Sequence, residues 1–134
     1  MLIRINPLDE APIFEQIRFQ VKGAVARGEV DAGDRLPSVR ELARELSINP
    51  NTVVRAYESL EHDGVVARRQ GAGCFVTGRT STLHDDERRR RLEVRLERAV
   101  TDAFHLGFSA GEIREALEKA LKSVRFPRGR RQAR

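Results

Sequence analysis

The chain has 134 residues, of which 40% are hydrophobic and 34% are charged, enough for one ordinary domain with a modest core. Its single cysteine, Cys74, excludes an internal disulfide framework and a multi-cysteine zinc site. No apolar run approaches the roughly 18 residues of a membrane span, so we expect no membrane partner.

The net charge of +5 is unevenly distributed along the chain. Residues 1–78 contain 10 Lys and Arg against 11 Asp and Glu, whereas residues 79–134 contain 15 against 9. A basic excess suits nucleic acid, but it also suits any arginine-rich surface. A DNA-binding surface within residues 1–78 must therefore come from arginines that are gathered on one side.

The sequence offers little for catalysis. It contains no Ser/His/Asp set, no paired carboxylates in an apolar setting and no phosphate-binding loop. The three histidines show no metal-ligand spacing, so we expect no metal, no cofactor and no enzyme. The first ten residues lack the apolar stretch of a signal peptide, which predicts a cytoplasmic protein.

The first predicted helix covers about fifteen residues between Pro12 and Gly28. Its apolar side chains repeat at helical spacing, at Ile13, Ile17, Val21, Ala24 and Val25. The segment before it, residues 1–10, is either a short strand or a packed arm. We expect the helix to be the third wall of a small three-helix core.

Two further helices are predicted within residues 36–46 and 47–64. Ser38 is the N-cap of the first, and Asn49 and Pro50 define the start of the second. Two short capped helices joined by about three residues form a helix-turn-helix, whose second helix enters the DNA major groove. The exposed face of that helix carries polar groups that suit phosphates and base edges: Asn49, Asn51, Thr52, Arg55 and Glu58. The alternative is a helix pair inside an ordinary all-α core.

A β-hairpin is predicted next, with strands over residues 65–68 and 74–77 and a glycine-rich tip. A hairpin directly after a recognition helix is the wing of a winged helix. The tip glycines allow the backbone to approach DNA closely, and Arg68, Arg69 and Gln70 are placed to contact it. The alternative is a plain hairpin whose glycines only make the turn.

Small polar residues from Gly78 to Thr82 indicate a linker, and two amphipathic helices follow, the second with a capping box of Ser109 and Glu112. Such a pair leaves apolar surface in water, and a second copy of the chain is the simplest partner. The alternative is packing onto the chain's own winged domain. The residues predicted to dimerise are Leu92, Leu96, Val100, Phe104, Phe108, Ile113, Leu117 and Leu121.

These expectations define a mainly α fold with a small β-hairpin. A winged helix-turn-helix DNA-binding domain covers residues 1–78, a two-helix dimerisation extension covers residues 83–126, and residues 127–134 form a basic, disordered tail.

The region from Gly33 to Val76 resembles the GntR family of bacterial transcription regulators, and it reads GDRLPSVRELARELSINPNTVVRAYESLEHDGVVARRQGAGCFV. The short two-helix extension looks like the YtrA-type branch, in which such an extension is similar to a dimerisation module. Many members of the family carry an arginine where Val54 stands. Here the arginine is Arg55, and whether it contacts a base, a phosphate or an acid such as Glu58 stays open. By position, the resemblance places DNA contacts at Arg40, Asn49, Asn51, Thr52, Gln70 and Gly71.

The sequence therefore predicts a sequence-specific transcription regulator, a homodimeric repressor of a (pseudo)palindromic operator, by analogy that of a transporter operon. The expected partners are double-stranded DNA and a second copy of the chain. A small-molecule effector and a redox switch at Cys74 stay open, and the competing hypothesis is a protein-interaction module without sequence-specific DNA binding. The candidate DNA-binding residues are Arg35, Ser38, Arg40, Asn49, Asn51, Thr52, Arg55, Arg69, Gln70 and Gly71.

Overall fold

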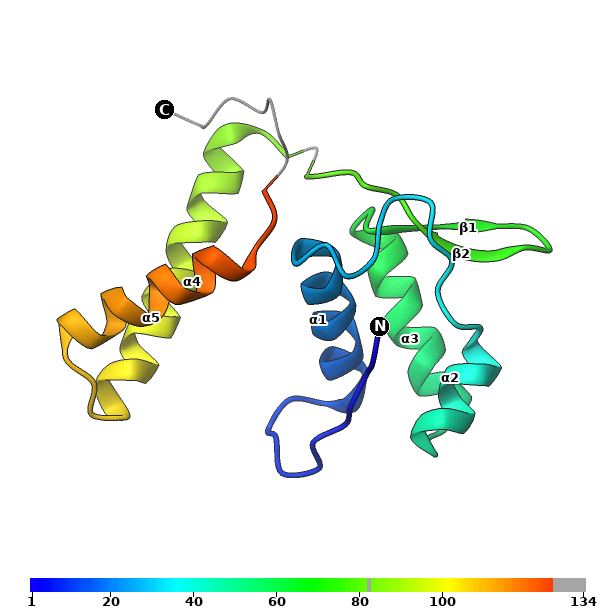
Figure 1. The fold of residues 1–134 in the computed structure, drawn as a ribbon, viewed down its shortest axis with the longest axis horizontal. Helices are drawn as coiled ribbons and strands as arrows, with labels where there is room; N and C mark the ends of the chain where they lie inside the picture. The colour runs from blue at the N-terminus through cyan, green and yellow to red at the C-terminus, as the bar shows by residue number, and fades with distance from the viewer. Residues whose placement is uncertain (82, 127–134) are drawn as a thin grey trace. The chain divides into compact units, whose positions relative to one another are not determined.

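The computed structural model describes residues 1–81 and 83–126, which form two compact units, Met1–Thr80 and a second that begins at Ser81 (Figure 1). The predicted basic tail, residues 127–134, lies outside the described residues. The fold class is confirmed: five helices and a two-stranded antiparallel sheet occur in the described part of the chain. Their bounds are α1 (Ile13–Ala26), α2 (Val39–Leu46), α3 (Pro50–His62), β1 (Val66–Arg69), β2 (Gly73–Val76), α4 (Asp85–His105) and α5 (Ala110–Ser123).

The core of the first unit lies between its three helices and the base of the hairpin. α1 and α3 lie side by side, and α2 packs against α3 (Figure 1). Each helix contributes one apolar stripe, as the 3.6-residue period requires. Burying one such aliphatic side chain contributes about 1.5–3 kcal/mol. The largest side chains with almost no exposure are Ile17, Val21, Leu42, Val53, Leu60 and Val66.

The helix-turn-helix begins and ends where its sequence predicts. Ser38 Oγ accepts a hydrogen bond from the backbone N–H of Glu41 at 3.0 Å, as expected of the predicted N-cap of α2. Asn49 Oδ1 accepts from the N–H of Asn51 at 2.9 Å, and Pro50 opens α3. Ser47 adopts the left-handed region with a φ of 55°, so the chain leaves α2 sharply.

The wing is a hairpin whose strands are shifted by one residue from the predicted bounds. Arg69 lies within β1 and pairs with Gly73, so the tip is Gln70–Ala72. The shift arises because Gly71 and Gly73 adopt positive φ angles of 74° and 110°, which places the turn between them. The bounds move towards the tip without a change of register, since Arg68 lies opposite Cys74 in both cases.

The N-terminal segment is a packed arm, since residues 1–6 form neither helix nor strand. Ile3 is buried in the core, and two glutamines of α1 bind the backbone of the arm. Gln20 exchanges hydrogen bonds with the N–H and C=O of Arg4, and Gln16 does the same with Asn6. These side-chain amides satisfy backbone groups that a neighbouring strand would otherwise pair.

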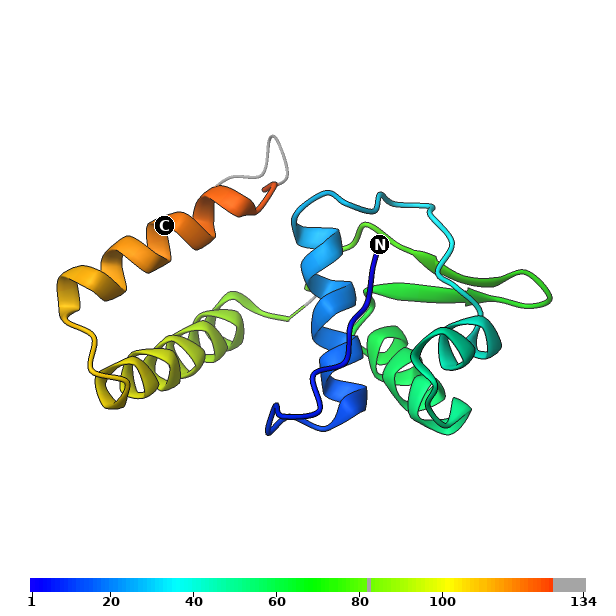
Figure 2. The ribbon, with the colours of Figure 1, turned by 60° about the horizontal axis from the view of Figure 1, so that its bottom comes forward.

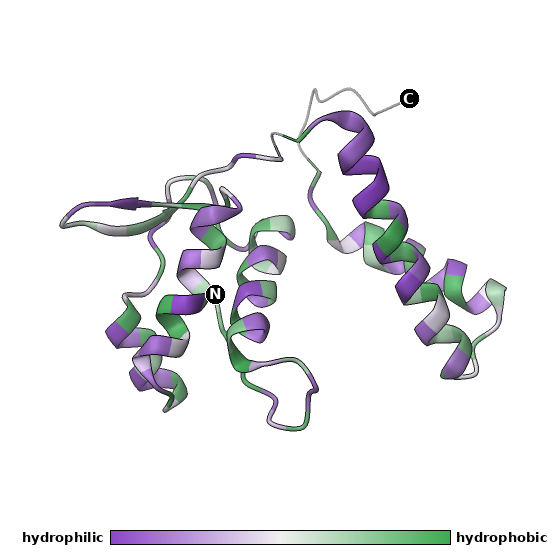
Figure 3. Cartoon of the chain, turned by 180° about the vertical axis from the view of Figure 1, so that it is seen from behind, coloured by the Kyte–Doolittle hydropathy of each residue, from purple (hydrophilic) through white to green (hydrophobic). Residues whose placement is uncertain are grey.

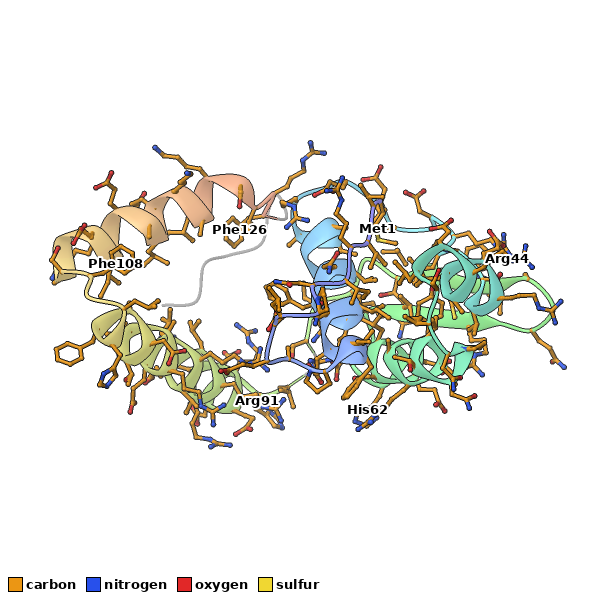
Figure 4. The ribbon with its side chains drawn as sticks, turned by 90° about the horizontal axis from the view of Figure 1, so that it is seen from below. Met1, Arg44, His62, Arg91, Phe108 and Phe126 are labelled. Carbon is orange, nitrogen blue, oxygen red and sulfur yellow. The ribbon has the colours of Figure 1, made fainter. Side chains whose placement is uncertain are left out.

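In the second unit, α4 and α5 diverge from the short turn that joins them (Figure 2). Between them lies an open groove of about 960 Å³. The predicted capping box is present, and the hydrogen bonds from the backbone and side chain of Ser109 lower the pKa of Glu112. Phe108 lies at the turn, at one end of the groove (Figure 4).

Neither α4 nor α5 has a buried residue. The first turns of α4 are hydrophilic, and apolar residues follow along the helix (Figure 3). Five of the residues predicted to dimerise line the groove, namely Leu96, Val100, Phe108, Ile113 and Leu117. The other three lie elsewhere on the exposed surface: Leu92, Phe104 and Leu121.

Tyr57 generates a test of this fold. It is 2% exposed on α3, and its hydroxyl donates to the C=O of Pro37 at 2.7 Å, which ties α3 to the start of α2. Burial raises the pKa of the Tyr57 phenol, so the hydroxyl keeps the proton that it donates. We expect Tyr57→Phe to lower the free energy of unfolding by about 1–2 kcal/mol in urea denaturation, because the Pro37 carbonyl loses its partner.

The exposed neighbour Glu58 supplies the control for this experiment. Glu58→Gln should change the free energy of unfolding by less than about 0.5 kcal/mol. A Tyr57→Phe protein as stable as the unmodified chain would contradict the role assigned to the hydroxyl.

Candidate nucleic-acid interface

The start of α3 presents polar groups without partners. The side chain of Asn51 is exposed and that of Thr52 half-buried, and neither has a hydrogen bond within residues 1–81. The Asn49 side-chain oxygen is occupied by the cap. The dipole of α3 also favours a phosphate near this helix start. A base edge or a phosphate oxygen can therefore be bound here without breaking an existing bond.

α2 adds positive charge beside this helix start. Arg40 is exposed and has no acidic partner among the described residues. Arg44, one helical turn further along, also lies on the surface of α2 (Figure 4). Ser38 is committed to capping α2 through its Oγ. Of the candidates near α2, Arg40 is therefore the one free to reach a phosphate.

The two arginines of the wing have different partners. Arg68 lies 3.7 Å from the carboxylate of Glu61 on α3. Arg69 lies instead over the ring of Phe75, with its guanidinium carbon 4.5 Å from the ring centre. At the tip, Gln70 and Gly71 are exposed. The wing thus presents Arg69, which is held by an aromatic ring, and beside it a short polar tip.

Arg35 comes from the segment before α2, but its side chain reaches the wing. Its Nε donates to the C=O of Ala72 at 3.1 Å. The backbone of this segment also pairs with β2, through Leu36 N–H to Cys74 O and Val76 N–H to Asp34 O. The sequence does not reveal this contact, because it joins residues 37 positions apart.

Arg55 rests on Phe14 of α1, with its guanidinium carbon 3.8 Å from the ring centre. It forms no ion pair with Glu58 within the described chain. A cation over an aromatic face is attracted by the electrons of the ring. The sequence left open an acid such as Glu58 as the partner of Arg55. In the structure the partner is the ring of Phe14. The only signal for it was that Phe14 falls off the apolar stripe of α1.

The far end of α3 is fixed to α1 by an ion-pair cluster. Asp63 accepts hydrogen bonds from Arg18 and Lys22, each at 3.0 Å. Burial alone would raise the pKa of Asp63, but the hydrogen bonds and charges of Lys22 and Arg18 hold it below its usual value. The cluster keeps Asp63 ionised and ties the end of α3 to α1.

Other kinds of site find little support in the parts of the chain that the structure describes. Residues 1–81 and 83–126 contain no group of three or more His, Cys, Asp or Glu that could hold a metal ion. No helix in these ranges is long and apolar enough to cross a membrane. Cys74 is half-buried in β2, and its carbonyl accepts from Leu36.

Comparisons with known proteins agree with this geometry. Residues 13–76 match the family described as bacterial regulatory proteins, gntR family. Over 124 residues the chain is 32% identical to the HTH-type transcriptional repressor YtrA of Bacillus subtilis (strain 168), a match that covers 92% of this chain and 95% of that protein.

Two solved structures resemble the fold over most of its length. One is a transcriptional antiterminator from Listeria monocytogenes EGD-e, with a TM-score of 0.77 and 30% identity over 90% of each chain. The other is YtrA from Sulfolobus acidocaldarius, a GntR-family transcription factor, with a TM-score of 0.61 and 34% identity. This second match covers 75% of the present chain and 99% of that one.

The contact between Arg55 and Phe14 can be measured with a double-mutant cycle on stability. We expect Arg55→Ala and Phe14→Leu to be coupled by about 0.5–1 kcal/mol, the range of an exposed cation–π contact. Phe19 lies on the same helix and is 75% exposed, so Phe19→Leu combined with Arg55→Ala should be additive. Additivity in both pairs would show that Arg55 does not rest on Phe14 in solution.

Proposed function

Because the chain belongs to the GntR family of bacterial regulatory proteins and is a DNA-binding transcription regulator, we propose that it acts as a homodimeric repressor that occludes a promoter. One observation carries the proposal: the unpartnered polar groups of Asn51 and Thr52, at a rigidly capped helix start, lie in the same small domain as the unpaired Arg40. These groups can exchange their water for phosphate oxygens or base edges without losing a bond within the described chain.

The proposed contacts divide by what each group can do. Arg40, the helix start and the wing backbone at Gly71 bind phosphates, which sets the position of the protein on the duplex. Asn51 and Thr52 read base edges in the major groove. Ser38 and Asn49 contribute mainly by capping the helices, since their side-chain oxygens are already occupied. Arg69 and Gln70 contact the DNA beside the groove that α3 enters.

Arg55 has a narrower role in this proposal. Its guanidinium lies over Phe14, which holds it towards the side of α3 that faces α1. We therefore assign it to the flank of the interface, where it contacts a phosphate. This assignment favours the phosphate over the base among the partners that the sequence left open.

The homodimer is proposed from the open groove of the second unit. Leu96, Val100 and Leu117 line it and are 41–48% exposed, which is unfavourable for aliphatic side chains in water. The same helix pair of a second copy offers equivalent apolar residues, and twofold symmetry closes the contact after two subunits. Such a dimer carries two recognition helices and requires a (pseudo)palindromic operator with half-sites about one DNA turn apart.

The target and the setting of the regulator are proposed by analogy with its relatives. The similar protein of Bacillus subtilis is named a transcriptional repressor, and we extend that role to this chain. A transporter operon is the proposed target, and the protein works in the bacterial cytoplasm, where its DNA lies. Apolar space between the subunits gives a small-molecule effector a place to bind.

The test is a fluorescence-anisotropy titration, near physiological salt, against the chain's own upstream region and a scrambled duplex of equal length. We expect tight binding to the upstream region only, with two subunits per site. Asn51→Ala should reduce discrimination between operator variants by about 1–3 kcal/mol. Arg40→Ala should weaken binding to both duplexes and flatten the salt dependence by roughly one unit of slope.

Two results would count against this function. Equal, weak and strongly salt-dependent binding to both duplexes would favour the interaction-module hypothesis. An unchanged ranking of operator variants by the Asn51→Ala protein would remove Asn51 from the base-reading set.

The dimer has a separate test with a closely matched control. Leu96 and Val94 lie on α4 and are 41% and 40% exposed, but only Leu96 lines the groove. We expect Leu96→Glu to weaken dimerisation by about 2 kcal/mol, roughly thirtyfold, in sedimentation equilibrium. Val94→Glu adds the same charge outside the groove and should leave the dimer intact. Equal effects of the two substitutions would show that the groove is not the interface.

A further inference from the structure

The wing alone is too small to hold its own shape. Its strands have four residues each, and an isolated hairpin of that size is marginal in water. A wing that contacts DNA needs a defined tip, because a mobile tip loses conformational entropy when it binds. Something outside the hairpin must therefore order residues Gln70–Ala72.

The segment before α2 supplies this support along the edge of β2. Gly33 N–H donates to Val76 O at 2.8 Å, and Leu36 N–H donates to Cys74 O at 2.8 Å. Arg35 stands between these bonds and pairs antiparallel with Phe75. Directly opposed residues of a sheet share a face. The side chain of Arg35 therefore lies on the same face as Phe75, which is the face that also carries Arg69.

Gly73 leaves the space that lets Arg35 reach the tip. A Cβ at position 73 would come within 3.0 Å of Arg35 Nε, closer than such atoms normally approach. The guanidinium crosses over this glycine, and its Nε donates to Ala72 O at 3.1 Å. Gly73 also has a φ of 110°, which a residue with a side chain rarely adopts.

Both backbone groups of Ala72, at the end of the tip, are thereby fixed by different partners. Within the wing, Ala72 N–H donates to Arg69 O at 3.0 Å. Outside it, Arg35 holds the carbonyl of the same residue. Gln70 and Gly71 are exposed and have no such bond of their own to a described residue outside the wing.

We propose that Arg35 is a positioning residue, which fixes the wing tip in its DNA-binding shape through the Ala72 carbonyl. It affects DNA binding through Gln70 and Gly71 and makes no base contact of its own. This role separates Arg35 from Arg40, whose side chain has no partner in the described chain. The DNA part of the proposal rests on the function proposed above, whereas the structural part does not.

The structural part is tested on the DNA-free, full-length protein by amide hydrogen exchange. The informative probe is Ala72 N–H, whose bond to Arg69 O closes the tip. We expect Arg35→Ala to speed its exchange by about fivefold, the effect of losing one hydrogen bond of ordinary strength. The N–H of Ile48, bonded to Ala43 O in the helix-turn-helix, should be unchanged in the same sample and report on global stability.

Arg4→Ala is the matched control, since it removes an exposed arginine from the N-terminal arm. It should leave the exchange of Ala72 unchanged. Unaltered exchange of Ala72 in the Arg35→Ala protein would overturn the proposal, whatever happens on DNA.

The DNA part is tested by a double-mutant cycle between Arg35 and Gln70, with the upstream duplex as the probe. Arg35→Ala should weaken binding about tenfold alone but less than about threefold in the Gln70→Ala background, because both changes act through one tip. Strictly additive effects would mean that Arg35 contacts DNA independently, and the positioning role would be wrong. If Gln70→Ala has no effect by itself, the wing contact of the proposed function fails, and the exchange experiment still decides the role of Arg35.

Discussion

The first unit depends on keeping α3 buried along one side and bare at its start. Val53, Tyr57 and Leu60 anchor the buried side, and each is at most 2% exposed. The contacts to α1, α2 and the loop at Pro37 fix the direction of the helix. With the helix direction set by burial, the groups at its start need no internal partner to hold them. The packing of the core, and not a set of side-chain hydrogen bonds, thus positions the polar groups at the start of α3.

The near-neutral charge of residues 1–78 is compatible with DNA binding because several of their acids are neutralised by ion pairs away from the start of α3. Several cations of the first unit are bound to acids, among them Arg18 and Lys22 with Asp63, and Arg68 with Glu61. These pairs join α1 and β1 to the far end of α3. Among residues 1–78, the arginines that make no ion pair within the described chain are Arg4, Arg35, Arg40, Arg44, Arg55 and Arg69. A count of charges hides this division, because an acid paired elsewhere does not repel a phosphate at the interface.

Sequence patterns predicted what is local and missed what is distant. Capping residues, the proline at the helix start and the apolar period each act within a few positions, so both helices of the helix-turn-helix were predicted with their ends. The wing strands reach one residue further towards the tip than predicted, because the positive φ angles of Gly71 and Gly73 shorten the turn. The contacts of Arg35 with Ala72 and of Arg55 with Phe14 join separate segments, and no period of the sequence encodes them. Both involve arginines that the sequence assigned to DNA, and residue type alone does not reveal these internal partners.

The second unit poses the opposite physical problem from the first. Without a buried residue, α4 and α5 are held by local terms: the capping box at Ser109 and exposed ion pairs such as those of Glu87 with Arg90 and Arg91. Exposed ion pairs contribute little, and most of the stability of a helix in a protein comes from packing its apolar face. If the partner of that face is a second copy, ordering of the extension and association are one event. Occupancy of the operator then rises with protein concentration more steeply than for a preformed dimer, because two monomers must associate for each operator that is bound.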